Sequence, residues 1–112
     1  MDKYFHSELK AETVDAVTEV TLQKHLNKSQ VSIQPLDAEG KAVTSAVTGT
    51  VTVQAFPVGV STPDAAYLQT VDVATATTVS LSGFFDKVTV TPTDLANGGV
   101  AGYAVITSQI VG

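Results

Sequence analysis

Alternation of valine with threonine is the feature that most limits how this chain can fold. In residues 49–57 the apolar and the uncharged polar residues fall on opposite sides of an extended chain: Val51, Val53 and Ala55 against Thr50, Thr52 and Gln54. β-Branched residues favour strands, because they pack well on a pleated, half-buried surface. The segment therefore predicts a strand that ends at Pro57, which cannot donate a ladder hydrogen bond.

Similar short segments recur along the chain. They cover residues 17–24, 31–34, 49–57, 67–73, 77–81, 87–91 and 103–111. Turn residues lie between them, notably Asp37 to Gly40 and Asn97 to Gly99, and we expect Pro35 and Pro92 to stop the strands that they follow. This spacing predicts an all-β fold: an antiparallel β-sandwich of about seven strands, immunoglobulin-like, with an N-terminal arm.

The N-terminal segment has a different character, because four of the six lysines lie in the first 28 residues among interleaved acidic residues. Leu9, Val14, Val17 and Val20 have nearly helical spacing, whereas the sequence from Val20 alternates as a strand does, so residues 8–20 fit either structure. Their β-branched residues lower helix propensity. We therefore expect a loose arm through about residue 12, and divide the chain into an arm, 1–16, and a sandwich domain, 17–112.

Composition limits the classes of partner. The net charge is −5 and every basic residue is a lysine, so the arginine-containing basic stripe typical of DNA- and RNA-binding surfaces is missing. The same negative charge argues against docking on anionic membranes. No segment approaches the roughly 20 apolar residues of a membrane span, and the N-terminus does not resemble a secretory signal. We expect a chain made in the cytosol that binds neither nucleic acid nor membrane.

Catalytic and metal-binding patterns were sought and not found. The two histidines, His6 and His25, lack a second ligand at metal-binding spacing, and the chain has no cysteine. The acidic residues of the β-rich part are isolated near turns, and neither a nucleophile elbow nor a phosphate-binding glycine loop occurs. We expect no enzymatic activity, no cofactor and no metal site.

Three segments of the β-rich part carry a resemblance to a known class of proteins. They are GTVTVQAFPVG at 49–59, FFDKVTVTPTDL at 84–95 and AGYAVIT at 101–107. This chain resembles small structural proteins of tailed-bacteriophage virions, which often contain a "GTVTV-x-A-x-PVG" strand, a "-FD-x-V-x-VTPT-x-L" strand and a closing "Y-x-V-x-V/T" strand. The basic residue often present in the "VTPT" strand is missing here, and no tryptophan precedes Phe84.

The resemblance implies a non-enzymatic virion protein, made in the host cytoplasm, that decorates a capsid or sits in a tail or head fibre. Such proteins act as homo-oligomers docked on other capsid or tail subunits through an N-terminal segment. Applied to this chain, the partner-binding residues are Tyr4, Phe5 and Leu9, which would insert into a neighbouring subunit. Two adjacent aromatic residues in a polar terminus have no local core to join, although the arm could also fold back on its own sandwich.

A different function class stays open from the residues alone. An immunoglobulin-like adhesion or carbohydrate-binding module would use loops 59–66 and 96–102 as its contact surface. The absence of tryptophan weighs against it, because sugar-binding sites commonly stack on such rings.

Overall fold

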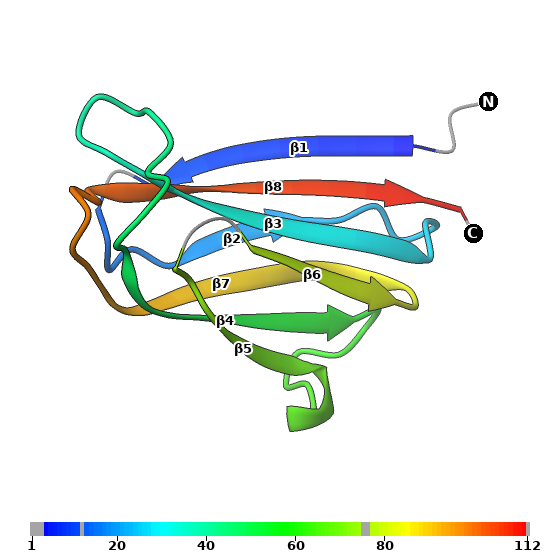
Figure 1. The fold of residues 1–112 in the computed structure, drawn as a ribbon. Coiled ribbons are helices and arrows are strands. Elements are labelled where there is room, and N and C mark those ends of the chain that lie inside the picture. The colour runs from blue at the N-terminus through cyan, green and yellow to red at the C-terminus, as the bar shows by residue number, and fades with distance from the viewer. Residues whose placement is uncertain (1–3, 12, 75–76, 112) are drawn as a thin grey trace.

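Two four-stranded antiparallel sheets face each other in the computed structural model, which describes residues 4–11, 13–74 and 77–111, with the side chains of Tyr4 and Phe5 excluded (Figure 1). The first sheet has the order β1 (Tyr4–Ala11), β8 (Gly102–Ile110), β3 (Lys28–Leu36) and β6 (Thr77–Ser82). The second has the order β2 (Thr18–Thr21), β7 (Phe85–Ala96), β4 (Thr48–Pro57) and β5 (Leu68–Asp72). A single turn of 3-10 helix, η1 (Ala65–Tyr67), precedes β5.

The strand orders 1-8-3-6 and 2-7-4-5 are those of a jelly roll, a sandwich built from two Greek keys. The predicted all-β antiparallel sandwich is therefore confirmed. Eight strands form it rather than about seven, and the chain crosses between the sheets after most strands, an order that differs from the immunoglobulin arrangement. Within the described residues, no helix is long and apolar enough to cross a membrane.

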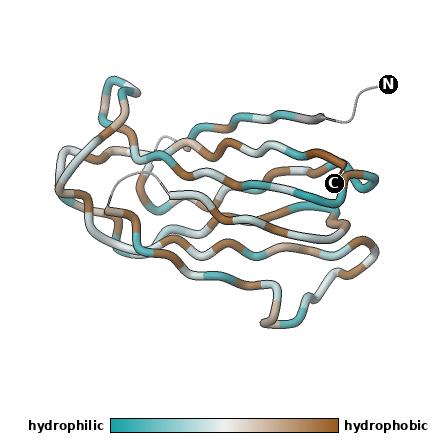
Figure 2. Tube along the Cα trace, turned by 45° about the vertical axis from the view of Figure 1, so that its right-hand side comes forward, coloured by the Kyte–Doolittle hydropathy of each residue, from teal (hydrophilic) through white to brown (hydrophobic). Residues whose placement is uncertain are grey.

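The core lies between the sheets and consists mainly of valine. Val31 and Ile33 of β3 and Val51 and Val53 of β4 are almost completely buried, and Val105 of β8 packs with them. Figure 2 shows the resulting alternation of apolar and polar residues along the strands. Each fully buried valine stabilises the fold by about 1.5–3 kcal/mol, which is why the period-two pattern determines the strand register.

The N-terminal segment is not a loose arm. Residues Tyr4–Ala11 form β1, which pairs with β8 over its whole length, from Tyr4 opposite Ile110 to Ala11 opposite Tyr103. The pairing gives both strands ladder hydrogen bonds and places Leu9 and Ala11 on the core-facing side, where Ala11 packs against the core. Residue 12 lies outside the described residues, and the strand expected over 17–24 is shorter, only Thr18–Thr21.

Pro35 and Pro92 do not stop their strands as expected, because β3 continues to Leu36 and β7 to Ala96. Both prolines lie just beyond the end of a shorter neighbour. β6 pairs with β3 only as far as Ile33, and β2 pairs with β7 only as far as Val90. Beyond Ile33 residues 42–43 take the place of β6 beside β3: the Val43 N–H donates to the Pro35 carbonyl at 2.9 Å, and Leu36 bridges to Ala42. A residue without an N–H is tolerated at such irregular strand ends. The predicted end of β4 at Pro57 is confirmed.

Two buried polar side chains of β8 reach across to the second sheet. The Tyr103 hydroxyl donates to the Ala16 carbonyl and lies 2.8 Å from the Thr18 hydroxyl, and burial raises the pKa of Tyr103 above its ordinary value although the Thr18 hydrogen bond opposes the shift. The Gln109 amide accepts from the Gln23 N–H at 2.8 Å and donates to the Gln23 carbonyl at 3.2 Å. These contacts fix the sheets relative to each other.

Candidate functional site: the outer surfaces of the sandwich

The outer face of the β2-β7-β4-β5 sheet consists largely of threonine. Opposite the buried valines, Thr50 and Thr52 of β4 lie beside Thr93 and Thr91 of β7, and Thr52 also lies beside Thr70 of β5 with their hydroxyls 3.1 Å apart. We call this set, with Thr89, the threonine face. Charged groups border it: Asp72 lies opposite Thr50 at one edge, Asp94 follows Thr93, and the Glu19–Lys87 ion pair, 2.7 Å apart, lies towards β2.

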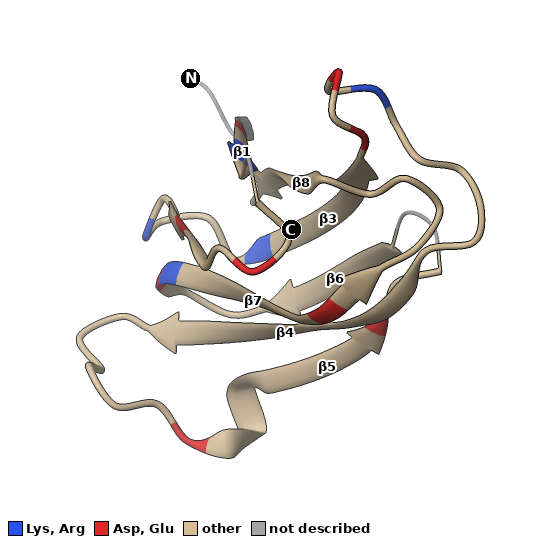
Figure 3. Cartoon of the chain, turned by 90° about the vertical axis from the view of Figure 1, so that its left-hand side faces the viewer, with Lys and Arg blue, Asp and Glu red and all other residues tan. Residues whose placement is uncertain are grey.

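Charged residues gather elsewhere on the molecule. Figure 3 shows many of the Lys, Asp and Glu residues in loops and near strand ends, in the part of the chain drawn in colour, although Glu8 and Lys10 lie within β1 and Glu19 lies within β2. On the outer side of the other sheet, Gln30, Ser32, Thr78 and Ser80 fill the centre of β3 and β6, and the Ser32 and Thr78 hydroxyls are 3.0 Å apart. Both outer faces therefore carry short, uncharged polar side chains.

The sequence-predicted docking residues Tyr4, Phe5 and Leu9 all lie on β1, at the edge of the first sheet. Their strand partners on β8 are Ile110, Gln109 and Val105. The structure describes the backbone but not the side chains of Tyr4 and Phe5, so their predicted role in docking stays a prediction. Leu9 is paired with the buried Val105, and antiparallel partners share a face, so its side chain lies on the core-facing side of the sheet.

Leu9 is nevertheless 40% exposed. The second sheet covers it poorly because β2, the strand on this side of that sheet, spans only Thr18–Thr21, whereas β1 has eight residues. On the opposite side of β1, Glu8 and Lys10 form an exposed ion pair at 3.9 Å. The edge of β1 thus combines an incompletely covered apolar side chain with one charge of each sign.

A second exposed apolar region surrounds the end of β4, and sequence reasoning missed it. We call it the apolar rim; its members are Val58, Val60, Tyr67, Leu68 and Phe84. The Val58 N–H donates to the Phe84 carbonyl at 3.3 Å, and the Tyr67 ring packs edge-on against Phe85. From the sequence, residues 59–66 were interpreted as a polar loop and, in the alternative function, as part of a contact surface, without the apolar residues around it. The available signal was the Phe84-Phe85 pair, of which only Phe85 is buried.

Asp86 attaches the loop between β4 and β5, which we call the rim loop, to β7. Its Oδ2 accepts from the Gly59 N–H at 2.9 Å, and its Oδ1 lies 3.3 Å from Lys24 Nζ. The Gly59 N–H, followed by Lys24, lowers the pKa of Asp86 below its ordinary value of 3.8, although partial burial opposes this. A hollow of about 360 Å³ lies here, lined by Phe56, Gly59, Val60, Ser61, Asp86 and Lys87.

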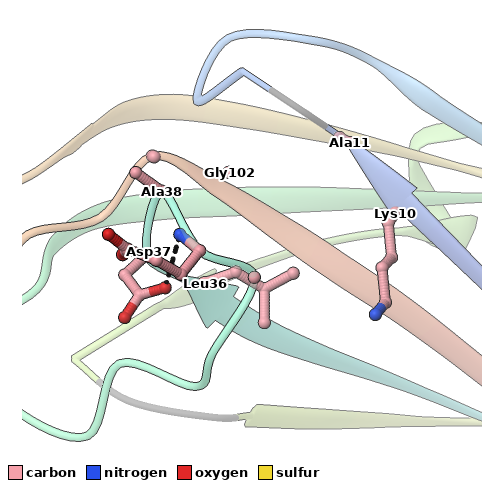
Figure 4. Close-up of a pocket in the computed structure, with 9 residues that line it drawn as sticks. Lys10, Ala11, Leu36, Asp37, Ala38 and Gly102 are labelled. Carbon is pink, nitrogen blue, oxygen red and sulfur yellow. Dashed lines mark hydrogen bonds between the residues drawn. The ribbon is translucent and has the colours of Figure 1, made fainter.

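A larger hollow of about 520 Å³ lies where β1 ends, between β1, the start of β8 and the turn after β3. Figure 4 shows Lys10 on one side of it and Asp37 on the other. As the sequence predicted, Asp37 stabilises a turn: its Oδ1 accepts from the N–H groups of Glu39 and Lys41, both at 2.9 Å. The titratable residues that line the hollow are Lys10, Asp37 and Glu39.

The two histidines lie on different elements: His6 on β1 and His25 in the loop between β2 and β3. Among the residues that the structure describes, no group of three or more potential ligands is placed to hold a metal ion.

Comparison with known proteins gives structural neighbours but no family. No family model matches the sequence, and no curated protein matches it. A solved structure described as a Bacillus endospore appendage, from a family of disulfide-linked pili, is similar with 14% identity and a TM-score of 0.47, covering 97% of this chain and 88% of that one. The coat protein dimer of Tobacco streak virus is similar with 11% identity and a TM-score of 0.39, covering 100% and 90%. These identities and TM-scores do not place the chain in a family.

Proposed function

We propose that this chain is a non-enzymatic structural protein of a bacteriophage virion, which assembles as a homo-oligomer and docks on capsid or tail subunits partly through β1. The threonine face is the observation that carries the proposal. Sheet faces that remain in water usually carry Lys and Glu, which keep proteins soluble and prevent strand edges from pairing. A face of Thr50, Thr52, Thr70, Thr89 and Thr91 lacks that protection.

Threonine suits a face that becomes buried against another subunit. Its hydroxyl needs only one or two partners, which a neighbouring hydroxyl or backbone group can provide, whereas a buried lysine or glutamate must be paired. The 3.1 Å contact between Thr52 and Thr70 shows that these hydroxyls already bond to each other across strands. The face can therefore lose water at small cost.

The apolar rim supplies an anchor of a different kind. Phe84 is 53% exposed, and Val58 beside it is 45% exposed, so covering them contributes hydrophobic stabilisation that the threonine face cannot. Interfaces commonly bury aromatic and aliphatic anchors at their centre. We assign the rim to contact with another virion subunit and the threonine face to contacts between copies.

The proposal is tested by light scattering of the purified chain over a wide concentration range, together with co-sedimentation with assembled phage shells and tails. We expect a homo-oligomer that co-sediments, and weaker co-sedimentation for Phe84→Ser. Thr62→Ser, in the rim loop but outside the rim, is the control. A strict monomer without affinity for any particle would contradict the proposal.

Two exposed aromatic rings favour the carbohydrate-binding alternative as a second candidate function. Tyr67 and Phe84, both exposed, flank the loop that this alternative uses, and aromatic rings can stack on sugars. A glycan array separates the two functions. Binding to a defined glycan that Tyr67→Ala abolishes would favour the binding module over the virion protein.

A further inference from the structure

The outer edge of β1 is open in the described part of the chain, because β1 is the terminal strand of its sheet and pairs only with β8. It is also long for an edge, with eight residues against four to six in the edge strands β2, β5 and β6. Figure 1 shows it running along the top of the molecule, with no other strand beyond it. A row of unpaired backbone groups on such an edge can bind another strand.

The charges on β1 restrict which strand can bind. Pairing with a negative or a positive strand would place like charges opposite Glu8 or Lys10, which is unfavourable. A second copy of β1 running antiparallel offers both signs. Residues paired across two antiparallel strands share a face. In a twofold dimer one residue of β1 therefore lies opposite its own copy, with the axis midway between the two, and the choice of that residue fixes the register.

The possible registers differ in what they place opposite each other. An axis at Glu8 or at Lys10 puts that charge opposite itself. An axis at Leu9 puts Glu8 opposite the partner's Lys10 twice, with Ser7 opposite the partner's Ala11, and brings the two exposed Leu9 side chains together on the core-facing side. An axis at Ser7 pairs Glu8 with the partner's His6 and leaves Lys10 without an acidic partner. The Leu9 register is therefore the best matched in both charge and apolar contact.

Other edges do not specify a register in this way. β6 reads Thr-Thr-Val-Ser-Leu-Ser and carries no charge, so all of its self-pairings are electrostatically equivalent. β5 carries only Asp72. Among the edge strands of the described residues, only β1 carries charges of both signs, Glu8 and Lys10, with an apolar residue, Leu9, between them.

We infer that two copies of this chain pair through β1 in antiparallel register about a twofold axis at Leu9, joining their first sheets into one continuous eight-stranded sheet. This inference rests on the homo-oligomer of the proposed function: it assigns the hydrogen-bonding edge of β1 to a second copy, and docking on capsid or tail subunits then uses the faces of the joined sheet and the apolar rim. The paired segment is short, so the contact is weak by itself and acts together with the other surfaces of an assembly. It leaves the threonine face and the apolar rim free for other partners.

Cysteine substitution tests the register directly, because the chain has no cysteine of its own. Residues directly opposite in an antiparallel pair have Cα atoms about 4.5–5.5 Å apart, which a disulfide can span. Leu9→Cys should therefore form a covalent dimer on mild oxidation. Ser7→Cys should not, since the two Ser7 positions lie about 14 Å apart along the strands. Ser7→Cys mixed with Ala11→Cys should cross-link.

Charge reversal provides an independent test. Glu8→Lys alone and Lys10→Glu alone each place like charges opposite each other, so the dissociation constant of the dimer should rise about tenfold or more. The double variant Glu8→Lys/Lys10→Glu should restore wild-type association, and a mixture of the two single variants should form heterodimers. Lys28→Glu makes the same change of charge as Lys10→Glu, but on β3, and should leave association unchanged.

The outcomes separate this inference from the proposed function. If Ser7→Cys cross-links and Leu9→Cys does not, the Leu9 register is wrong. If the chain oligomerises but neither cysteine variant cross-links and charge reversal has no effect, β1 pairing is wrong, whereas the proposed assembly role stands. If the wild-type chain stays monomeric and binds no particle, both are wrong.

Discussion

Tyr103 concentrates several interactions in a single side chain. It is fully buried on β8, and its hydroxyl bonds to the Ala16 carbonyl and to the Thr18 hydroxyl in and beside the other sheet. Tyr103→Phe keeps the ring but leaves these groups without a partner, so we expect the free energy of unfolding to fall by about 1–3 kcal/mol. Urea unfolding measures this. Tyr67→Phe, at an exposed ring, should change it by less than about 0.5 kcal/mol.

Asp86 gives the stability a defined dependence on acid. Because its pKa is lowered in the folded chain, the carboxylate contributes stability above its ordinary pKa of 3.8, and that contribution is lost as the pH falls through the lowered value. Asp86→Asn keeps an acceptor for the Gly59 N–H but removes the charge beside Lys24. We expect the variant to be less stable than the wild type at neutral pH, with the difference shrinking below pH 3.8. Thermal melts of the wild type and the variant across this pH range measure the difference. Equal melting temperatures at neutral pH, or a difference that does not change with pH, would contradict the prediction.

At the scale of elements, a glycine sets the geometry where β4 begins. Gly49 has a φ of +115° beside a register shift in the β4–β7 ladder, and a Cβ there would lie 2.6 Å from the Asp94 carbonyl oxygen. Gly99 also has a positive φ, +83°, but nothing lies within 4 Å of its would-be Cβ. Gly99→Ala should cost about 1 kcal/mol from backbone strain alone. Gly49→Ala should cost distinctly more, which denaturant unfolding of the two variants measures.

The elements that the sequence predicted well are those with a strict period of two. Val51 and Val53 fix β4, and the turn at Asp37 is fixed by its own side chain, so both depend only on neighbouring residues. The extension of β7 through Pro92 depends on how far β2 reaches, and β2 is distant in sequence. The structure of residues 4–11 likewise depends on the open side of β8, nearly a hundred residues away. Local patterns do not contain these relations.

The candidate site shows the same limit. Leu9 was singled out from the sequence, but its exposure follows from the shortness of β2, which only the packing of the two sheets reveals. The apolar rim combines residues of the β4–β5 loop, η1, the start of β5 and the turn before β7; the hydrogen bond between Val58 and Phe84 joins the first and last of these. Exposed apolar residues are common singly, and only their grouping marks a surface.

At the scale of the whole molecule, the sandwich has three different kinds of surface: an open charged edge at β1, a hydrophobic rim at the end of β4, and two sheet faces with uncharged centres. A surface of this kind has a cost. With little charge on its faces, the chain depends on a net charge of −5, carried at edges and loops, to stay dispersed before assembly. Association through the uncharged sheet centres should therefore be stronger at high salt or near the isoelectric point, whereas the β1 contact, which pairs opposite charges, should be weaker at high salt.

A charge placed in the middle of the threonine face tests whether that face is buried in the assembly. Thr91 is exposed on β7 beside Thr52, so Thr91→Lys should change the free energy of unfolding by less than about 0.5 kcal/mol. In an assembly that covers the face, the lysine would be buried without a partner, which is costly. We expect a chain that folds normally, by circular dichroism and melting, but forms smaller oligomers by light scattering. Thr62→Lys, in the exposed loop after β4, controls for the added charge, and equal assembly of both variants would show that the threonine face stays in water.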